Sequence, residues 1–370
     1  MEKMLLEACC EILDSMRVPI TAANRQEGPY PYYGANGIQD YVADYIFDDD
    51  LVLLAEDGGN FGSKEKPIAY RVSGKCWINN HAHVLKPKIG LNVDYLCYSL
   101  MFYKVDGIVN GATRQKLTQA SMRKMQIPYR SMEEQLQIVQ KLTRILKIKN
   151  QRQQELTLLD ELIKSRFVEL FGDAIYNDKG WKTDTVDNLC EEIYGGGTPS
   201  KSHSEYYEDG DIPWVSSKDM KTDVLIDSQI KINQLGVDNS TAKIVPINSV
   251  IMVIRSGILK HTLPVAINAV PITVNQDLKV FIPGERVLTR FLAVQFKMHE
   301  KDILSGVRAV TADNIEFNSL KQRKLIVPPI ELQKEYVSFL GQIDKLKATI
   351  QKSIDEAQTL FDSLMQEYFG

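Results

Sequence analysis

The residues whose spacing first suggests chemistry are His81 and His83, which flank Ala82 in a strand-like run. Alternate residues of a strand point to one face, so the two imidazoles would lie together, with Cys76 near in sequence. A tetrahedral zinc site needs four ligands, and no second Cys/His cluster at ligand spacing completes the set. We therefore expect no metal. A histidine pair offering hydrogen bonds from a strand surface is the favoured interpretation, and buried structural histidines are the alternative.

Two adjacent carboxylates, Glu56 and Asp57, could serve as a general acid and base. The residues that follow them, 58–60, are Gly-Gly-Asn, which is typical of a turn. The sequence has no Gly-x-Ser-x-Gly elbow. It also lacks the Asn-Pro-Pro-Tyr/Phe motif with which amino-methyltransferases hold a flipped base. The chain therefore has the pattern of a binding protein, and an enzyme built on Glu56, Asp57 and the histidine pair is the least favoured hypothesis.

A glycine-rich segment, GGGTP at residues 195–199, is similar to a phosphate-binding loop. It lacks the Gly-Lys-Ser/Thr ending, and Pro199 argues against a helix that begins there. A glycine-rich turn after a strand explains the segment equally well, although its backbone N–H groups could meet a nucleic-acid phosphate. The segment does not support a nucleotide-binding enzyme.

Length and composition set broad limits. The chain has 370 residues, enough for two ordinary domains, and a net charge of −4, so a nucleic-acid partner would have to be bound by local clusters. Five cysteines without a framework spacing indicate reduced thiols and a cytoplasmic location. No run is apolar enough for a membrane span, and no signal segment stands at the start, so we expect no membrane partner.

The second half of the chain repeats the first. The sequences LDELIKSRFVELFG (159–172) and AQTLFDSLMQEYFG (357–370) share a Phe-Gly ending at an offset of 198 residues. A Cys-Glu pair followed by Pro recurs at 10–19 and 190–199, and strand-like runs and turns then recur in the same order. The globular parts close with Ile-Pro at 127–128 and Val-Pro-Pro at 327–329.

A long segment with few Gly or Pro residues follows each of these closing motifs. Apolar residues recur in it at steps of three and four, which is the pattern of a coiled-coil seam. The predicted packing residues are Leu156, Leu159, Ile163 and Leu170 in the first segment and Ile350, Ile354, Phe361, Leu364 and Tyr368 in the second. We expect the two helices to pack on each other, and a pseudo-twofold axis would relate the halves if they pair antiparallel. Two unrelated helices docked on their own domains are the alternative.

Side chains suited to DNA recognition recur at matching places in the two halves. Asn, Gln, Arg, Ser and Lys read base edges, whereas Lys and backbone donors hold phosphates. The predicted DNA-binding residues are Tyr32, Asn36, Asn60, Asn79, Asn80, His81 and Arg114 in the first half and Lys201, Trp214, Ser216, Lys218, Arg255, Asn275 and Arg308 in the second. Any one of them could be an ordinary surface group, so the prediction depends on their repetition at equivalent turns.

The order of these elements resembles that of the DNA-specificity (S) subunit of Type I restriction–modification systems. After each closing motif come Met132-Glu-Glu-Gln135 or Ile330-Glu-Leu-Gln333 and then a helix that ends in Phe-Gly. The segments PYYGANGI (31–38) and NNHAHV (79–84) are also similar to its target-recognition domains. The resemblance covers nearly the whole chain, although a lead-in at 172–184 has no counterpart before the first module.

The resemblance implies an α+β fold with two strand-rich target-recognition domains separated by two long helices. The helices would pair as an antiparallel coiled coil, with a pseudo-twofold internal repeat. The domains would be residues 1–130 and 173–329, and the spacer helices residues 131–172 and 330–370. Each domain would read one half of a bipartite, gapped site in double-stranded DNA.

The resemblance also implies partners. Modification (M) methyltransferase subunits and a restriction (R) subunit would use S-adenosylmethionine, ATP and Mg²⁺, and this chain would bind none of these cofactors itself. It would be a non-catalytic specificity subunit that directs methylation and cleavage. The alternative is a two-domain coiled-coil scaffold that binds protein partners without recognising DNA.

Overall fold

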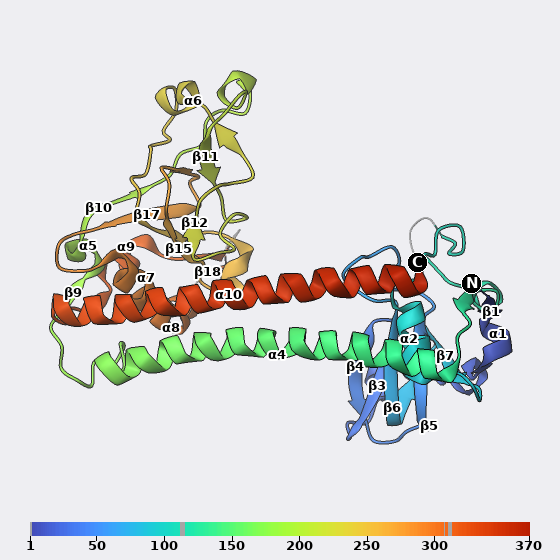
Figure 1. Cartoon of the computed structure of the whole chain (residues 1–370). Helices are drawn as coiled ribbons and strands as arrows, with labels where there is room; N and C mark the ends of the chain where they lie inside the picture. Colours follow the sequence, from blue (N-terminus) through green and yellow to red (C-terminus); the bar gives the residue numbers. More distant parts are fainter. Residues whose placement is uncertain (1, 112–114, 307, 310–312) are drawn as a thin grey trace. The chain divides into compact units, whose positions relative to one another are not determined.

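The computed structural model describes residues 2–111, 115–306, 308–309 and 313–370, with only the backbone of 308–309 (Figure 1). The chain forms two compact units. Unit 1 comprises Met1–Gln154 with Ile350–Gly370, and unit 2 comprises Glu155–Thr349. Each unit contains one strand-rich module and parts of two 40-residue helices, α4 (Met132–Phe171) and α10 (Ile330–Phe369). We call the globular part before α4 module 1 and the part between the helices module 2.

Module 1 is built on a six-stranded sheet of order β2-β7-β5-β6-β3-β4, with a separate β1–β8 pair. Its strands are β1 (Lys3–Leu5), β2 (Cys10–Ile12), β3 (Tyr30–Gly34), β4 (Gly37–Val42), β5 (Phe47–Ala55), β6 (Ala69–Ile78), β7 (Ala82–Pro87) and β8 (Gln126–Pro128). Its helices are α1 (Leu6–Cys9), α2 (Val93–Met101) and α3 (Gln119–Arg123). The apolar run at 51–55 makes β5 a central strand, since these residues are fully buried on both faces of the sheet.

Module 2 contains a five-stranded sheet of order β10-β17-β14-β15-β12, a three-stranded sheet β13-β11-β16, and the pairs β9–β20 and β18–β19. Its strands are β9 (Thr183–Thr185), β10 (Cys190–Gly195), β11 (Ile212–Val215), β12 (Val224–Leu225), β13 (Lys231–Ile232), β14 (Val250–Val253), β15 (Val265–Asn268), β16 (Thr273–Val274), β17 (Leu278–Pro283), β18 (Arg308–Ala309), β19 (Asp313–Asn314) and β20 (Lys324–Ile326). Its helices are α5 (Val186–Leu189), α6 (Gln234–Asp238), α7 (Thr289–Met298), α8 (Glu300–Ser305) and α9 (Phe317–Gln322).

The central strands pair in the same way in the two modules. Strand β5 lies between β6 and β7, and β14 lies between β15 and β17, with antiparallel pairing throughout. The parallel pair of β3 with β6 is matched by that of β11 with β16. The ten-residue β6 has two short counterparts, β15 and β16, and Pro271 stands between them without a backbone N–H for a sheet ladder. The internal repeat is therefore a repeat of structure as well as of sequence.

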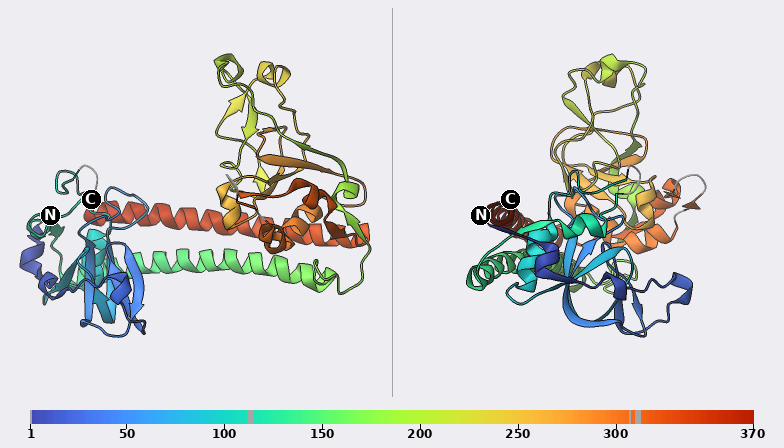
Figure 2. Two further views of the ribbon diagram at one scale, coloured as in Figure 1. Left: turned by 180° about the vertical axis from the view of Figure 1, so that it is seen from behind. Right: turned by 90° about the vertical axis from the view of Figure 1, so that its right-hand side faces the viewer.

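Within each unit, α4 and α10 lie side by side and antiparallel (Figures 1 and 2). In unit 2 the Tyr336 hydroxyl donates a 3.0 Å hydrogen bond to the Ile163 carbonyl. In unit 1 the Lys141 ammonium donates a 3.3 Å hydrogen bond to the Tyr368 hydroxyl. The predicted packing residues of both helices are all buried or half-buried. Of the helices in the described part of the chain, none combines the length and apolarity that a bilayer crossing requires.

The repeated helix ending packs at the same place on each module. The ring of Phe171, the last residue of α4, lies 4.9 Å from that of Phe291 in α7. The ring of Phe369, the last residue of α10, lies 5.3 Å from that of Tyr95 in α2. Helix α4 therefore begins at module 1 and ends on module 2, whereas α10 begins at module 2 and ends on module 1. The two helices share one ending because each must fit the same kind of surface.

A buried glutamine in the first turn of α4 joins this helix to module 1. The Gln135 side chain accepts a 2.8 Å hydrogen bond from the backbone N–H of Asn92, at the start of α2. It donates 3.0 Å hydrogen bonds to the carbonyls of Gly90 and Arg130. One polar side chain therefore satisfies three backbone groups at the junction of helix and module.

Gln333 has the same role at the start of α10. It accepts from the backbone N–H of Leu288 at 3.0 Å and donates to the carbonyls of Arg286 and Pro328 at 3.0 and 2.9 Å. Gln333 is fully buried and Gln135 is 1% exposed. The glutamines of the two repeated motifs, Met132–Gln135 and Ile330–Gln333, are thus structural.

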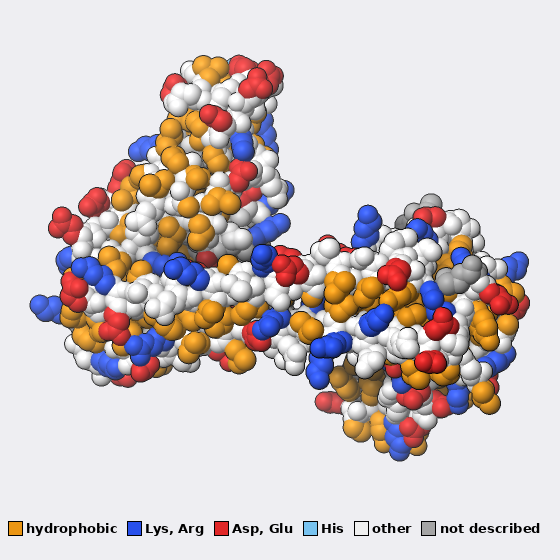
Figure 3. Space-filling model, in the orientation of Figure 1, with side chains coloured by type: hydrophobic (Ala, Val, Ile, Leu, Met, Phe, Trp, Pro, Cys, Tyr) orange, Lys and Arg blue, Asp and Glu red, His pale blue; other side chains and the backbone are white. Residues whose placement is uncertain are grey.

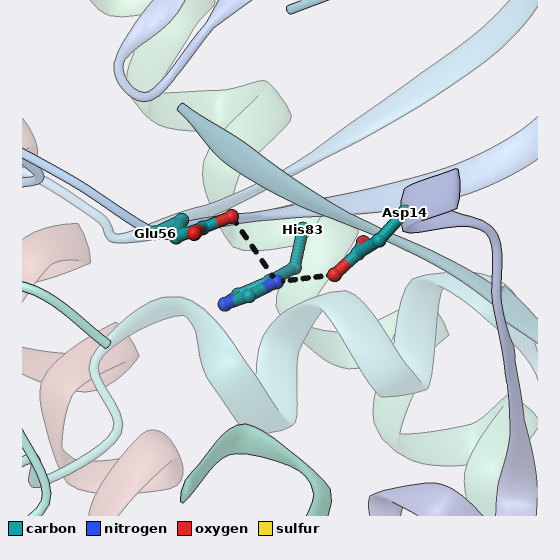
Figure 4. A group of neighbouring side chains, drawn as sticks. All are labelled: Asp14, Glu56 and His83. Atoms are coloured by element: carbon teal, nitrogen blue, oxygen red, sulfur yellow. Dashed lines mark hydrogen bonds and ion pairs between the residues drawn. The ribbon is translucent and has the colours of Figure 1, made fainter. Parts of the chain in front are cut away.

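Module 1 also buries an ionic cluster of Asp14, Glu56 and His83 (Figure 4). Nδ1 of His83 lies 2.7 Å from Asp14 Oδ2 and 3.6 Å from Glu56 Oε2. Its Nε2 lies 2.9 Å from the carbonyl oxygen of Leu117. His83 is thus a fully buried structural histidine, and it does not form the pair with His81 on a strand surface that the sequence favoured.

The cluster is neutralised by the protein's own cations. Arg17 Nη1 lies 2.7 Å from Glu56 Oε2, and its Nη2 lies 3.5 Å from Asp14 Oδ2. Burial raises the pKa of Asp14. The hydrogen bond and charge of His83 lower it, together with other hydrogen bonds, by more than burial raises it, so the pKa lies below its usual value. The pKa of Glu56 is also lowered, because Arg17 and His83 outweigh burial. An arginine that already pairs with both carboxylates leaves little attraction for a divalent cation, so we assign the cluster a structural role.

We expect Gln135→Ala to lower the free energy of unfolding by about 1–3 kcal/mol, because buried backbone groups lose their partner. Urea unfolding followed by circular dichroism gives the loss, and hydrogen exchange should accelerate at the start of α2. Gln137 is exposed on the same helix, so Gln137→Ala is the matched control, with an expected change below about 0.5 kcal/mol. Equal losses in the two variants would contradict the assigned role.

The ionic cluster predicts a pH-dependent stability. A carboxyl whose pKa is lower in the folded than in the unfolded chain stabilises the fold above its unfolded pKa, about 3.9 for Asp, and loses this contribution as pH falls through the folded pKa. Asp14→Asn should therefore lower the free energy of unfolding by about 3 kcal/mol at pH 7, and by progressively less below about pH 4.

The measurement is urea unfolding at several pH values between 7 and 3. Asp44 is exposed outside the cluster, so Asp44→Asn controls for the loss of one surface carboxylate. If the Asp14→Asn variant keeps the wild-type dependence on pH, the cluster does not act as described.

Candidate nucleic-acid interface

A tight turn follows β6 and carries three of the predicted DNA-binding residues. The backbone N–H of Asn79 donates a 3.0 Å hydrogen bond to the carbonyl of Tyr33 in β3. The Asn79 side chain accepts from the N–H of His81 at 2.8 Å and donates to Gln39 at 3.0 Å. Asn79 is 3% exposed. Its side chain therefore shapes the turn, while Asn80 beside it is exposed.

Module 2 forms the same turn after β16. The backbone N–H of Asn275 donates to the carbonyl of Val215 in β11 at 2.9 Å. Its side chain accepts from the N–H of Asp277 and donates to the Asp277 carboxylate, both at 3.1 Å. Asn275 is 7% exposed, and the next residue, Gln276, is exposed. In each module, a buried asparagine thus holds a turn that presents an exposed amide. We call these turns the reading turns, 79–81 and 275–277.

The last residue of each reading turn is held by the first two backbone N–H groups after the neighbouring strand, β5 in module 1 and β14 in module 2. The N–H groups of Glu56 and Asp57 both donate to the carbonyl of His81, at 2.9 and 3.3 Å. In module 2, the N–H groups of Ile254 and Arg255 both donate to the Asp277 carbonyl, at 2.8 and 3.3 Å. Arg255, a predicted DNA-binding residue, is thereby placed against the reading turn of module 2.

The predicted aromatic residues Tyr32 and Trp214 occupy equivalent positions in β3 and β11, and both are buried, at 1% and 6% exposure. The Tyr32 hydroxyl accepts a 3.0 Å hydrogen bond from the N–H of Ile20, and the Trp214 indole donates a 3.0 Å hydrogen bond to the carbonyl of Gly197. Each ring thus anchors the loop that crosses it. Neither ring is a surface on which a base could stack in this conformation.

Each of these rings forms one wall of a shallow hollow. The hollow in module 1, about 360 Å³, adjoins the reading turn through Asn79, Asn80 and His81, and Arg25 stacks over the Tyr32 ring at 4.2 Å. The hollow in module 2, about 420 Å³, is lined by Lys201 and Trp214. Lys201 is exposed there, as expected for a side chain that can reach phosphate.

The remaining predicted residues differ in exposure and in whether their side chains already form hydrogen bonds within the module. Asn36 is exposed and donates to the Gly58 carbonyl at 3.0 Å, which ties the β3–β4 turn to the segment after β5. Asn60 is half-buried and donates to the Pro67 carbonyl at 3.4 Å. Ser216 is half-buried, and its hydroxyl donates to Asp219 at 2.8 Å, whereas Lys218 is exposed.

Two predicted residues cannot be placed. Arg114 lies outside the described residues. Arg308 is described by its backbone alone, which pairs with Asn314 in the β18–β19 hairpin.

Sequence reasoning missed the part played by Asp277. The signal was present, because the repeat aligns Asp277 with His81 and Arg255 with Asp57. Within each module the two residues at these positions contact each other: Asp57 contacts His81 in module 1, and Arg255 contacts Asp277 in module 2.

The glycine-rich segment after β10 has a packing role. A Cβ atom on Gly196 would lie 2.0 Å from the carbonyl oxygen of Val274, and one on Gly197 would lie 2.3 Å from the Thr241 backbone. The glycines therefore allow two backbones to approach closely beside the reading turn. This close approach explains why the segment is rich in glycine, and no bound nucleotide is needed to explain it.

Comparison with known proteins agrees with this architecture. The sequence profile of the family described as Type I restriction modification DNA specificity domain matches residues 1–158 and 178–358. The specificity subunit of the type I restriction enzymes EcoR124I/EcoR124II of Escherichia coli is 31% identical over 318 residues, which cover 84% of this chain and 74% of that protein. The MjaIX specificity subunit of Methanocaldococcus jannaschii is 23% identical over 323 residues, 81% of this chain and 74% of that protein.

A solved structure shows the same fold. The crystal structure of the type I restriction-modification S subunit of M. genitalium aligns with all of this chain and 96% of its own, with a TM-score of 0.62 and 12% identity. Two repeated modules with reading turns, two antiparallel helices and the family match over both halves lead to one conclusion: this chain belongs to the family of Type I restriction–modification DNA-specificity subunits.

Proposed function

We propose that this chain reads a bipartite, gapped site in double-stranded DNA, one half-site by each module, and so directs methylation and cleavage by partner subunits. The observation that carries the proposal is the reading turn, which is built twice with a buried asparagine and the same backbone hydrogen bonds and presents different side chains in the two modules. Amides and charged side chains on such turns are the groups that recognise base edges. In this function the chain is a non-catalytic specificity subunit.

The surface of the long helices supports docking of the partner subunits. Away from the paired face, Leu158 and Leu162 of α4 are 61% and 45% exposed, and Leu346 and Leu360 of α10 are 52% and 50% exposed. Hydrophobic side chains also appear along the visible face of these helices (Figure 3). We assign this surface to modification subunits, with a restriction subunit joining the complex. S-adenosylmethionine, ATP and Mg²⁺ would be used by those partners, in the cytoplasm.

The charge distribution supports shared DNA binding. The net charge is −4, and acidic and basic side chains are interspersed on the visible surface (Figure 3). Phosphate contacts provide most of the sequence-independent affinity for DNA. The specificity chain would therefore supply base contacts, while its partners would supply much of the phosphate contact.

The first test is methylome sequencing after co-expression with the cognate modification subunit. We expect one bipartite motif with a fixed gap. Methylation of an ungapped site, or of none, would contradict the proposal. The scaffold alternative predicts a complex with no affinity for DNA at any salt concentration. The proposed function instead predicts DNA binding that weakens steeply between about 50 and 200 mM salt.

The second test concerns the gap. Lys149 contacts Gln358 in unit 1 and Asp160 contacts Lys347 in unit 2, so deletions of 151–157 and 350–356 remove equal lengths between these contacts. If the helices set the gap, the double deletion removes about 10 Å and should shorten the gap by about three base pairs. Either deletion alone mismatches the helices and should abolish methylation. A methylated site that retains the original gap would contradict this role.

A further inference from the structure

The two modules place a carboxylate and a nitrogen base in contact at one equivalent position, with the two groups exchanged between the strand end and the turn. In module 1, Asp57 follows β5 and its Oδ2 lies 3.6 Å from Nδ1 of His81 in the reading turn. In module 2, Arg255 follows β14 and its Nη2 lies 2.6 Å from Oδ1 of Asp277 in the reading turn. The carboxylate thus lies just after the central strand in module 1 and in the turn in module 2.

The backbone around this position is the same in both modules. The N–H of Gly58 donates to the Gln115 carbonyl at 3.3 Å, and the N–H of Ser256 donates to the Asp313 carbonyl at 3.1 Å. An isolated antiparallel β-bridge of the backbone also recurs, between Asp57 and Lys116 in module 1 and between Arg255 and Asn314 in module 2. The fold therefore accepts either polarity at this position. A partly exposed ion pair also contributes little to stability, so the fold does not require the arginine.

Arg255 is nevertheless held in one orientation. Its Nε and Nη2 lie 2.7 and 2.6 Å from Oδ1 of Asp277, and the other oxygen, Oδ2, accepts from the buried amide of Asn275 at 3.1 Å. The Arg255 side chain is 47% exposed, although that of its partner Asp277 is only 24% exposed. About half of the side chain is thus open to solvent while its polar end is anchored to a turn that also carries the exposed Gln276.

A guanidinium fixed along one edge presents its remaining N–H donors to the outside. Guanine offers two neighbouring acceptors, O6 and N7, in the major groove, and arginine is their commonest partner. An oriented fork also loses little conformational freedom when it binds. At the equivalent place, module 1 has a histidine and a carboxylate, which cannot form this contact.

We infer that Arg255, positioned by Asp277, reads a guanine in the half-site of module 2. The Asp57–His81 pair gives the half-site of module 1 a different base preference at the equivalent position. This inference depends on the proposed function and names a specificity-determining residue for it.

The test uses the whole complex of this chain with its modification subunit, and measures methylation of DNA with each base at every position of the gapped site. With Arg255→Ala, one position of the module 2 half-site should lose its preference for guanine by about 5- to 150-fold. The other positions and the module 1 half-site should keep their preferences. Arg255→Lys retains the charge without the fork and should give an intermediate loss.

Arg286 provides the matched control. It is 55% exposed and pairs with Asp184 at 2.7 Å in the same module, outside the reading turn. Arg286→Ala removes the same charge and should leave every base preference unchanged. Asp277→Asn, which keeps Arg255 but weakens its anchor, should reduce the guanine preference at the same position. Circular dichroism confirms that each variant is folded.

The outcomes separate the two levels of the hypothesis. If the wild-type complex methylates no gapped site, the proposed function itself is wrong. If the wild-type complex reads a gapped site and Arg255→Ala and Arg255→Lys leave the guanine preference unchanged, the proposed function stands and the inference is wrong. An equal loss of preference in Arg286→Ala would also overturn it, because the effect would then come from charge alone.

Discussion

The hydrogen bonds of Gln135 and Gln333 fix where each long helix leaves its module, and the rest of the structure depends on this junction. A helix of 40 residues with an apolar stripe gains most of its stability in a protein from packing of that stripe. Here each helix is held at its start by a buried glutamine and at its end by an aromatic residue, Phe171 or Phe369, packed on the other module. The apolar stripes can then meet in antiparallel register, because the entry and exit points of both helices are set by the same contacts.

In each reading turn, one residue holds the backbone in place and a different residue exposes its side chain. Asn79 and Asn275 use their backbone and side-chain groups within the module, and they are the same residue type in both turns. The residues beside them, Asn80 and Gln276, are exposed and differ. A buried asparagine with satisfied hydrogen bonds is costly to replace, whereas an exposed side chain on a fixed turn can change without loss of stability. Such a turn suits a protein whose recognition chemistry differs between modules of one fold.

The module cores have diverged further than the turns. At the position where module 1 buries His83 in its ionic cluster, module 2 has Lys279, whose ammonium lies 4.5 Å from the centre of the Phe317 ring. Burial lowers the pKa of Lys279. One module surrounds a buried histidine with carboxylates, and the other places a half-buried lysine against an aromatic face. The backbone pairing of the central strands is unchanged, because it depends on N–H and carbonyl groups that every residue except proline supplies.

The sequence by itself determined the two modules and the two long helices, because periodicity and repetition are properties of local sequence that survive folding. The family resemblance implied the antiparallel pairing, and the structure confirms it within each unit. It also selected Asn79, Asn80, His81 and Asn275, which the structure places in two equivalent turns. Only the tertiary structure decided which polar residues are already engaged. Asn79 and Asn275 are inside the turns, Tyr32 and Trp214 are buried under loops, and Arg255 is anchored by Asp277. Exposure and ion pairing depend on contacts between residues far apart in the chain, and no local pattern specifies them.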